Sequence, residues 1–242
     1  ATPDGYTVLS ADNGTMVFNS ALYSKLSYNP ATDLTPVTLM GRFPMILVVG
    51  PGTDAKDAKD FIAKAKAQPG KLSYGSAGAG SPHHLAMELL KINATLHMVH
   101  IPYRGAAPAL TDVAGGQIPA MMVDLAAGAG FIKGGKVRPL AVANDKRLAQ
   151  LPDVPTFAEL GFKGVEAAAQ VGLVAPAGLP AIVADTLQKQ VAAVINQPQI
   201  KQKLIEFGIE PVGSTPKAYA DLIKSETVRW HKVIKDQGIR LD

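Results

Sequence analysis

Cysteine is absent from the 242 residues of this chain, which excludes disulfides, thiolate nucleophiles and cysteine-ligated zinc sites. Aromatic residues make up only 6% of the sequence, and lysine and arginine never form a five-residue block. The stacking surface and dense basic patch of a nucleic-acid binder are therefore missing, and we expect no nucleic-acid partner. The sequence also lacks a run of about 18 consecutive uncharged apolar residues, so it predicts no membrane-spanning helix.

What remains is the composition of a globular protein. Hydrophobic residues account for 47% of the chain and charged residues for 18%, which indicates a substantial buried core. The length suits one large domain or two smaller ones, since domains usually run to roughly 100–200 residues. A formal net charge of +4 gives only a slight preference for anionic ligands.

Short apolar runs alternate with amphipathic stretches, which predicts an α/β fold with largely parallel sheets. The candidate strands are Tyr6–Ser10, Phe43–Val49, Leu72–Tyr74, Met98–Ile101, Ile118–Val123, Val137–Val142 and Val171–Ala175. The candidate helices are Asp54–Gln68, Pro82–Lys91, Ala107–Ala114, Ala181–Asn196, Pro198–Phe207 and Pro216–Gly238. Ligands of such folds bind beyond the carboxyl ends of the strands, so we expect the functional residues in strand-to-helix loops.

Two lobes are expected from the order of these segments. Residues 1–50 and 165–242 are assigned to a discontinuous first lobe, and residues 51–164 to the second. The strand at Phe43–Val49 would lead out of the first lobe, and the strand at Val171–Ala175 would lead back into it.

The loop from Tyr74 to His84 is the strongest local feature, because a strand gives way to a glycine-rich turn and then a helix. Ser81 fits the N-cap position and Pro82 the first helical position. Amides at the helix start, with the hydroxyls of Ser76 and Ser81, would form a cradle for a carboxylate or phosphate. The glycine order matches neither the dinucleotide fingerprint nor the P-loop. A tight turn without a ligand is the alternative interpretation.

Three further positions could face a ligand. Small residues after Tyr103 would let a ligand approach the helix start at Gly105 and Ala106, with Tyr103 as a ring wall. Asn13-Gly14-Thr15 follows the first strand, where a plain Asn-Gly turn is the alternative. Asp124 ends an apolar strand and either meets a ligand or caps the next helix.

The sequence shows no catalytic signature. The adjacent histidines His83 and His84 do not form a metal-binding pattern, no nucleophile elbow occurs, and no acid/base pair follows from spacing. We therefore predict no metal, no cofactor and no catalytic residue. The competing hypothesis is a small α/β enzyme whose glycine-rich loop holds a phosphate or acyl group.

Several segments, in this order, resemble the Bug-type family, the periplasmic solute-binding components of tripartite tricarboxylate transporters. They are Pro3–Thr7, Asn19–Tyr23, Pro69–Gly78, Pro102–Gly105, Pro108–Asp112, Leu151–Thr156 and Ala175–Gly178. Their joint occurrence covers nearly the whole chain.

The resemblance implies a type II periplasmic-binding-protein fold, in which two α/β lobes enclose an interdomain cleft. It implies capture of a small carboxylate, namely a di- or tricarboxylate, an acidic amino acid or an aromatic acid, and its delivery to the membrane permease subunits. The periplasm is the implied location, although this chain contains no signal peptide. Combined with the loop patterns, the candidate ligand-binding residues are Asn13, Gly14, Thr15, Ser76, Ala77, Gly80, Ser81, His84, Tyr103, Gly105, Ala106 and Asp124.

Two departures from the family pattern stand out. Where family members commonly have an aromatic residue, this chain has Gln170-Val171. Family members also normally begin with a strand, a Pro-Gly-Gly loop and a helix, which do not precede Asp4-Gly5-Tyr6 here. We therefore expect the N-terminal portion of the first lobe to be missing, with one carboxylate-holding loop lost. Lower stability, weaker binding and self-association through the exposed edge are the expected consequences.

Overall fold

The computed structural model describes residues 1–242, and the chain divides into two compact units. Unit 1 comprises Ala1–Arg42 and Ala169–Asp242, and unit 2 comprises Phe43–Ala168. The chain leaves unit 1 within the long strand β2 (Leu34–Val49) and returns at the beginning of β7 (Ala168–Pro176). The lobe boundaries expected near residues 50 and 165 lie at the end of β2 and shortly before β7.

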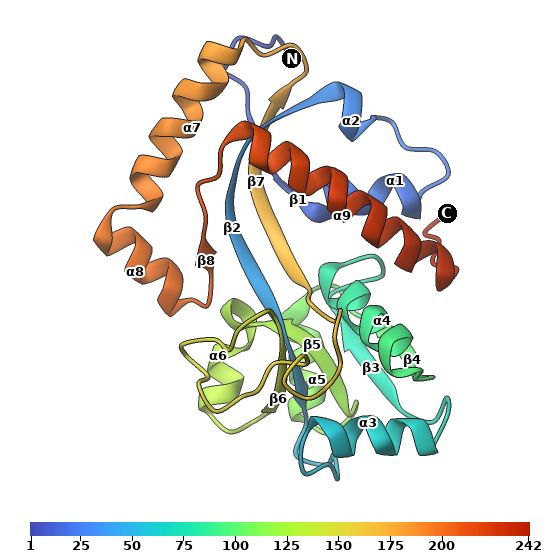
Figure 1. Ribbon diagram of the computed structural model, residues 1–242. Helices are drawn as coiled ribbons and strands as arrows, with labels where there is room; N and C mark the ends of the chain where they lie inside the picture. The colour runs from blue at the N-terminus through green and yellow to red at the C-terminus, as the bar shows by residue number, and fades with distance from the viewer. The chain divides into compact units, whose positions relative to one another are not determined.

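Unit 2 is a five-stranded sheet with the order β6-β2-β5-β3-β4. The remaining strands are β3 (Ser73–Ser76), β4 (Val99–Pro102), β5 (Ala120–Asp124) and β6 (Arg138–Ala143). Its helices are α3 (Ala58–Ala67), α4 (Pro82–Ala94), α5 (Ala106–Ala114) and α6 (Leu125–Lys133). Helices α4, α5 and α6 directly follow β3, β4 and β5, and Figure 1 shows α4 beside the β3–β4 pair.

The expectation of largely parallel sheets holds only for part of unit 2. Strand β3 is parallel to β4 and to β5, whereas β2 is antiparallel to both β5 and β6. Parallel strands need a crossover connection, and a helix follows each of β3, β4 and β5. Strand β2 instead brings the chain into unit 2, so it runs opposite to the strands that follow.

The core of unit 2 lies where this sheet meets its helices. Ile46 and Val48 of β2, Met121 and Val123 of β5, and Leu110 of α5 are all fully buried in one cluster. Such strands, covered on both faces, read as continuous apolar runs rather than as alternating patterns. This explains why the sequence located them without difficulty.

Unit 1 contains strands β1 (Leu9–Asp12), β7, the first half of β2, and β8 (Glu210–Pro211). β1 pairs antiparallel with β7, and β8 pairs antiparallel with β2. Its helices are a short π-helix η1 (Gly14–Phe18), α1 (Asn19–Leu22), α2 (Pro30–Asp33), α7 (Ala181–Ile195), α8 (Pro198–Glu206) and α9 (Pro216–Asp236).

Helix α9 packs its aromatic residues into unit 1. The Trp230 ring meets Phe18 edge-on at a centroid distance of 5.4 Å, and both side chains are buried. Tyr219 lies over Gly172 of β7, where an added Cβ would come within 2.3 Å of the tyrosine ring. Gly172 is therefore the residue that admits this ring.

Two predicted strands differ from the structure, and several short elements were not predicted. The first strand is Leu9–Asp12 instead of Tyr6–Ser10. Tyr6 is 94% exposed and lies in a turn, where its amide donates to the Asp4 carboxylate. Strand β2 starts at Leu34 instead of Phe43. The prediction was too short because Pro36, Gly41 and Pro44 resemble strand breakers in the sequence, although the strand accommodates them. The short strand β8 and the short helices η1, α1 and α2 were not expected.

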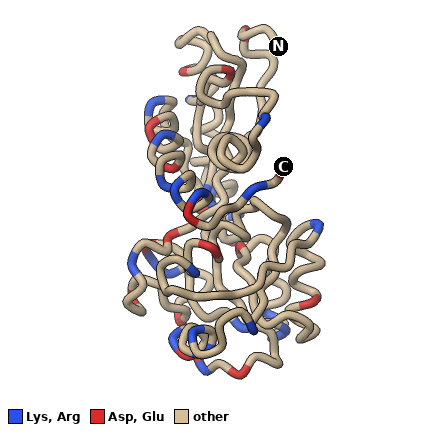
Figure 2. Tube along the Cα trace, turned by 90° about the vertical axis from the view of Figure 1, so that its right-hand side faces the viewer, with Lys and Arg blue, Asp and Glu red and all other residues tan.

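No helix of the chain combines the length and apolar character needed to cross a bilayer. Lysine and arginine are interspersed with aspartate and glutamate along the trace (Figure 2).

Candidate functional site

The candidate site in unit 2 lies at the carboxyl ends of β3, β4 and β5. Because these strands are parallel, their following loops meet at one edge of the sheet. The Gly105 amide donates to the Ala77 carbonyl over 3.2 Å, which joins the first two loops. The Nε2 atom of His83 on α4 lies 3.2 Å from Oδ2 of Asp124, and this contact joins the loop after β5 to the other two loops.

The glycine-rich loop after β3 is held by hydrogen bonds within the chain. The Gly78 amide donates to Ser76 Oγ over 3.1 Å, and the Gly80 amide donates to His84 Nδ1 over 3.0 Å. Gly78 and Gly80 have φ angles of +135° and +75°, a region that side-chain-bearing residues rarely adopt. These bonds leave the amides of Ala77 and Ala79 as loop donors without an acceptor inside the chain.

Ser81 is the N-cap of α4, as its position in the sequence indicated. Its Oγ accepts a hydrogen bond from the His84 amide over 3.3 Å and donates its proton to the Gly78 carbonyl over 2.7 Å. The hydroxyl proton is therefore already used. Pro82 occupies the first helical position and has no amide proton.

The start of α5 has a different design. Its N-cap is Gly105, with a φ of +115° and no side chain to cap the helix. The amides of Ala106 and Ala107 belong to the first turn and have no partner within the helix. A Cβ at Gly105 would meet nothing within 4 Å, so the space beside this helix start is open. Open amides at a helix start attract anions.

Tyr103 forms part of the wall next to this helix start. Its ring packs against the core of unit 2, and its hydroxyl donates to Asp112 Oδ2 over 2.6 Å. Burial and the neighbouring Asp112 carboxylate raise the pKa of Tyr103 to about 12. The hydroxyl is thus neutral and already bonded.

Asp124 is the N-cap of α6, so the capping interpretation describes its geometry. Oδ1 accepts the Ala127 amide over 3.0 Å while Oδ2 faces His83, and the residue is 9% exposed. Burial by itself would raise the pKa of this carboxyl, but the hydrogen bonds from His83 and Ala127 outweigh burial and lower it. Asp124 is therefore a buried carboxylate beside the loops.

His84 is one of three stacked rings next to the glycine-rich loop. Its imidazole lies 3.8 Å from that of His100, nearly parallel, and Tyr74 stacks on His100 at 5.0 Å. Burial lowers the pKa of both histidines to about 4, aided for His84 by Lys91 and for His100 by His84. Both rings are therefore neutral at pH 7.

The carboxylate of Glu88, four residues after His84 on helix α4, also belongs to this cluster. It accepts hydrogen bonds from the Tyr74 hydroxyl and from Lys91 Nζ, the latter over 2.6 Å. Sequence reasoning missed Tyr74, Glu88, Lys91 and His100. The helical spacing of His84, Glu88 and Lys91 on the mostly apolar helix α4 was a usable signal. No pattern pointed to His100, which comes from another strand.

Asn13, Gly14 and Thr15 belong to unit 1, where they begin the π-helix η1. Asn13 is buried, and its Oδ1 accepts the Gln170 amide over 3.4 Å. The Thr15 amide donates to Asp12 Oδ1 over 2.8 Å, so the Asp12 carboxylate already occupies this turn. Gln170 is also buried and donates to Glu226 over 3.2 Å.

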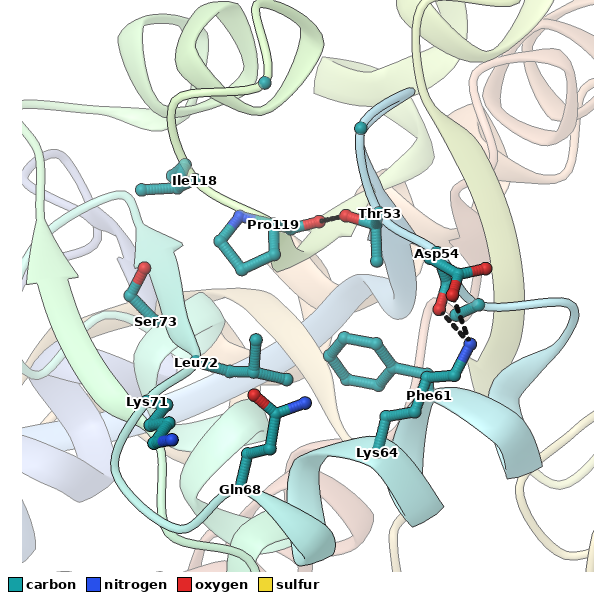
Figure 3. A pocket seen from close by; sticks show the side chains of 13 residues that line it. Thr53, Asp54, Phe61, Lys64, Gln68, Lys71, Leu72, Ser73, Ile118 and Pro119 are labelled. Carbon is teal, nitrogen blue, oxygen red and sulfur yellow. Dashed lines mark hydrogen bonds and ion pairs between the residues drawn. The ribbon is translucent and has the colours of Figure 1, made fainter.

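A separate hollow of about 410 Å³ opens in unit 2 beside α3 (Figure 3). Leu72, Ser73 and Pro119 line it, so it lies where β3 and β5 begin, away from the loops at their ends. Its Lys64 is paired with Asp54 and Asp60 at 3.0 and 3.2 Å. Lys71 also lines the hollow, which lies at the opposite ends of these strands from the candidate site and is not part of it.

No group of three or more histidine, aspartate or glutamate side chains is placed to hold a metal ion. The contact between Ser76 Oγ and His100 Nε2, at 2.7 Å, is the only serine–histidine pair at the site. Ser76 is fully buried, and its Oγ accepts the Gly78 amide. The site can therefore supply hydrogen-bond donors, whereas an accessible nucleophile is not apparent from its geometry.

Comparison with known proteins gives consistent matches over the whole chain. The sequence model of the family described as tripartite tricarboxylate transporter family receptor matches residues 1–239 of this chain. BugT of Bordetella pertussis is 30% identical over 239 residues, which are 98% of this chain and 73% of BugT.

Two similar solved structures contain a carboxylate. Rpa4515 of R. palustris, solved with adipate, is 36% identical with a TM-score of 0.90, and the match covers 100% of this chain and 81% of that one. MatC (Rpa3494) of Rhodopseudomonas palustris, with bound malate, is 30% identical with a TM-score of 0.84, covering 97% of this chain and 81% of that one.

Proposed function

Because the chain belongs to the tripartite tricarboxylate transporter receptor family, we propose that it binds a small carboxylate with the loops after β3, β4 and β5. The family resemblance read from the sequence is confirmed, as is the mixed α/β fold. The enzyme hypothesis finds no support among these relatives, which are solute-binding receptors.

The observation that carries the proposal is the set of backbone donors at one edge of the unit 2 sheet. Amides of Ala77 and Ala79 in the glycine-rich loop lie next to the open start of α5, and the Gly105–Ala77 hydrogen bond holds the two segments together. Hydrogen bonds to a charged group contribute about 1.5–3 kcal/mol each. Two or three of them would fix a carboxylate without any catalytic group.

We assign binding rather than catalysis to this edge. A catalytic serine must reach its substrate, and Ser76 is fully buried while the proton of Ser81 is held by the Gly78 carbonyl. His100, the histidine beside Ser76, has a pKa lowered to about 4 by burial and therefore is a weak base at pH 7. Mass spectrometry of a carboxylate incubated with the protein should recover the compound unchanged.

The solute is proposed to be a small di- or hydroxycarboxylate, since the relatives named above were solved with adipate and with malate. The negatively charged Asp124 lies beside the loops, so it should favour solutes that carry a hydroxyl or amino donor. Asp124→Asn should therefore weaken binding of malate more than binding of adipate.

Isothermal titration calorimetry tests the proposed function. Malate, adipate and a tricarboxylate should be titrated alongside adipamide, the uncharged diamide of adipate. At least one carboxylate should bind, and adipamide should not. Absence of binding for every carboxylate, or equal binding of adipate and adipamide, would contradict the proposal.

Membership of the family also supports a proposal for the location and the partners of this chain. We propose that the chain works in the periplasm and delivers its solute to the membrane permease subunits. Units 1 and 2 are proposed as the two lobes expected from the sequence. Self-association through β1 is also proposed, since β1 is an edge strand whose Leu9, like Val8 just before it, is more than one-third exposed. Light scattering at several protein concentrations tests that part.

A further inference from the structure

The two stacked histidines each hold one amide of the glycine-rich loop. His84 acts directly, because its Nδ1 accepts the Gly80 amide over 3.0 Å. His100 acts through Ser76, whose Oγ lies 2.7 Å from His100 Nε2 and accepts the Gly78 amide over 3.1 Å. The conformation of the turn from Gly78 to Gly80 therefore depends on two rings that lie outside this turn.

The bond to Gly80 requires one particular tautomer of His84. An Nδ1 that accepts a hydrogen bond carries a lone pair, so the proton of the neutral ring must sit on Nε2. That Nε2 lies 3.7 Å from Oε1 of Glu88, longer than a hydrogen bond but close enough for the carboxylate to favour a proton there. Glu88 is itself buried and fixed by Lys91 and Tyr74.

Protonation of His84 would break this arrangement. It would place an Nδ1–H against the Gly80 N–H, so two donors would face each other. It would also place a positive charge 3.8 Å from the face of His100. The titratable or charged groups around His84 are Tyr74 from β3, His100 from β4, and Glu88 and Lys91 from α4; of these, Lys91 and His100 oppose a second positive charge.

We propose that His84 and His100 are positioning residues for the carboxylate-binding loop, with Glu88 setting the His84 tautomer. The rings hold Gly78 and Gly80 so that the amides of Ala77 and Ala79 remain available to the ligand. This inference rests on the proposed carboxylate function and adds the residues that give the loop its shape. Neither histidine needs to touch the ligand.

Two substitutions at His84 distinguish its role as a hydrogen-bond acceptor from the packing of its ring. Asparagine places an oxygen where Nδ1 lies and retains the acceptor for Gly80, whereas leucine keeps the volume and removes the acceptor. His84→Leu should lower the affinity for malate, measured by calorimetry at pH 7, at least about tenfold, the loss expected for a misplaced charge-binding donor. His84→Asn should stay within about threefold of the wild type.

The exposed His97 of the same unit provides the matched control, and both His97→Asn and His97→Leu should bind as the wild type does. The proposal is wrong if His84→Leu binds malate as tightly as the wild type. It is also wrong if His84→Asn is as weak as His84→Leu while both retain the circular dichroism of the folded chain.

The tautomer can be read on the unsubstituted protein, which covers the case in which His84→Leu fails to fold. Long-range proton–nitrogen NMR correlations at pH 7 should show the proton of His84 on Nε2 and an unprotonated Nδ1. A proton on Nδ1 overturns the proposal. If the wild type bound none of the carboxylates, the proposed function would fail, whereas the NMR result would still decide whether His84 holds the loop.

Discussion

The starts of helices α4 and α5 occupy equivalent places in unit 2 and are built in opposite ways. Each follows a parallel strand, at the same edge of the sheet. At α4 the cap is Ser81, the first helical residue is a proline, and the preceding loop is tied to His84 and Ser76. At α5 the cap is Gly105, and no side chain caps the first turn.

The start of α4 shapes the glycine-rich loop, whereas the start of α5 is suited to bind the ligand. The α4 start consumes most of its polar groups within the chain, and it therefore fixes the geometry of the loop beside it. The α5 start leaves its amides open, and it is therefore suited to receive an anion. Substitutions at the two starts should consequently affect stability and affinity in different proportions.

Acid should destabilise the α4 start most strongly. The folded pKa of His84 is about 4 against an ordinary value of 6.5, so between these values the unfolded chain binds a proton that the folded chain does not. The stability contribution is complete above pH 6.5 and falls as the pH drops toward 4, by up to roughly 3 kcal/mol for this shift.

Urea unfolding of the wild type and of His84→Asn, followed by circular dichroism between pH 7 and pH 4.5, measures this contribution. Both proteins share the remaining titrating groups, so the difference between the two curves reports the titration of His84 together with its effect on the pKa of His100. The wild type should lose stability more steeply as the pH falls. Parallel curves would show that His84 titrates normally.

Removal of one amide from the α5 start should cost affinity without costing stability. Ala106 is the first helical residue of α5, a position where proline is well accommodated, so Ala106→Pro deletes the N–H and keeps the helix. Malate binding should weaken about ten- to a hundredfold if that amide meets the carboxylate.

Ala181 is the first helical residue of α7 in unit 1 and is exposed, so Ala181→Pro is the matched control. Calorimetry on both variants should show a loss only for Ala106→Pro. Equal affinities for the two variants would remove the Ala106 amide from the site.

Loss of the α4 cap should have the smallest effect on affinity. Ser81→Ala removes the acceptor of the His84 amide and should lower the unfolding free energy by about 1 kcal/mol. Malate affinity should change only a few fold, because the Ser81 proton already serves the Gly78 carbonyl.

Thr215 caps α9 in the same way in unit 1, so Thr215→Ala should show a similar loss of stability with unchanged binding. If Ser81→Ala instead weakened malate binding a hundredfold, the hydroxyl would have to contact the ligand directly.

The sequence predicted the α4 start well because its information is local. Ser81 and Pro82 are a capping pair that reads directly from the chain, and the glycines at positions 78 and 80 mark the turn. Asp124 was likewise recognised as a cap candidate. Local signals also located β3, β4 and β5 to within two residues at their ends.

The supporting cluster could not be read in the same way. His100 reaches His84 only because β3 and β4 pair in register, and nothing near His100 in the sequence announces that contact. The hydroxyl of Ser81 looked available, but its partner, the Gly78 carbonyl, is settled by the folded geometry. Strand β1 was misplaced because the apolar residues near Tyr6 suggested burial that the structure does not give them.

The central claim is that backbone amides at the carboxyl ends of β3 and β4 hold the carboxylate. It is tested most directly by titrating malate into nitrogen-15-labelled protein and following the amides of Ala77, Ala79, Ala106 and Ala107 by NMR. These amide protons should move downfield together and saturate at the dissociation constant found by calorimetry. If malate binds while these four amides stay unchanged and resonances elsewhere shift, the carboxylate site lies in another part of the molecule.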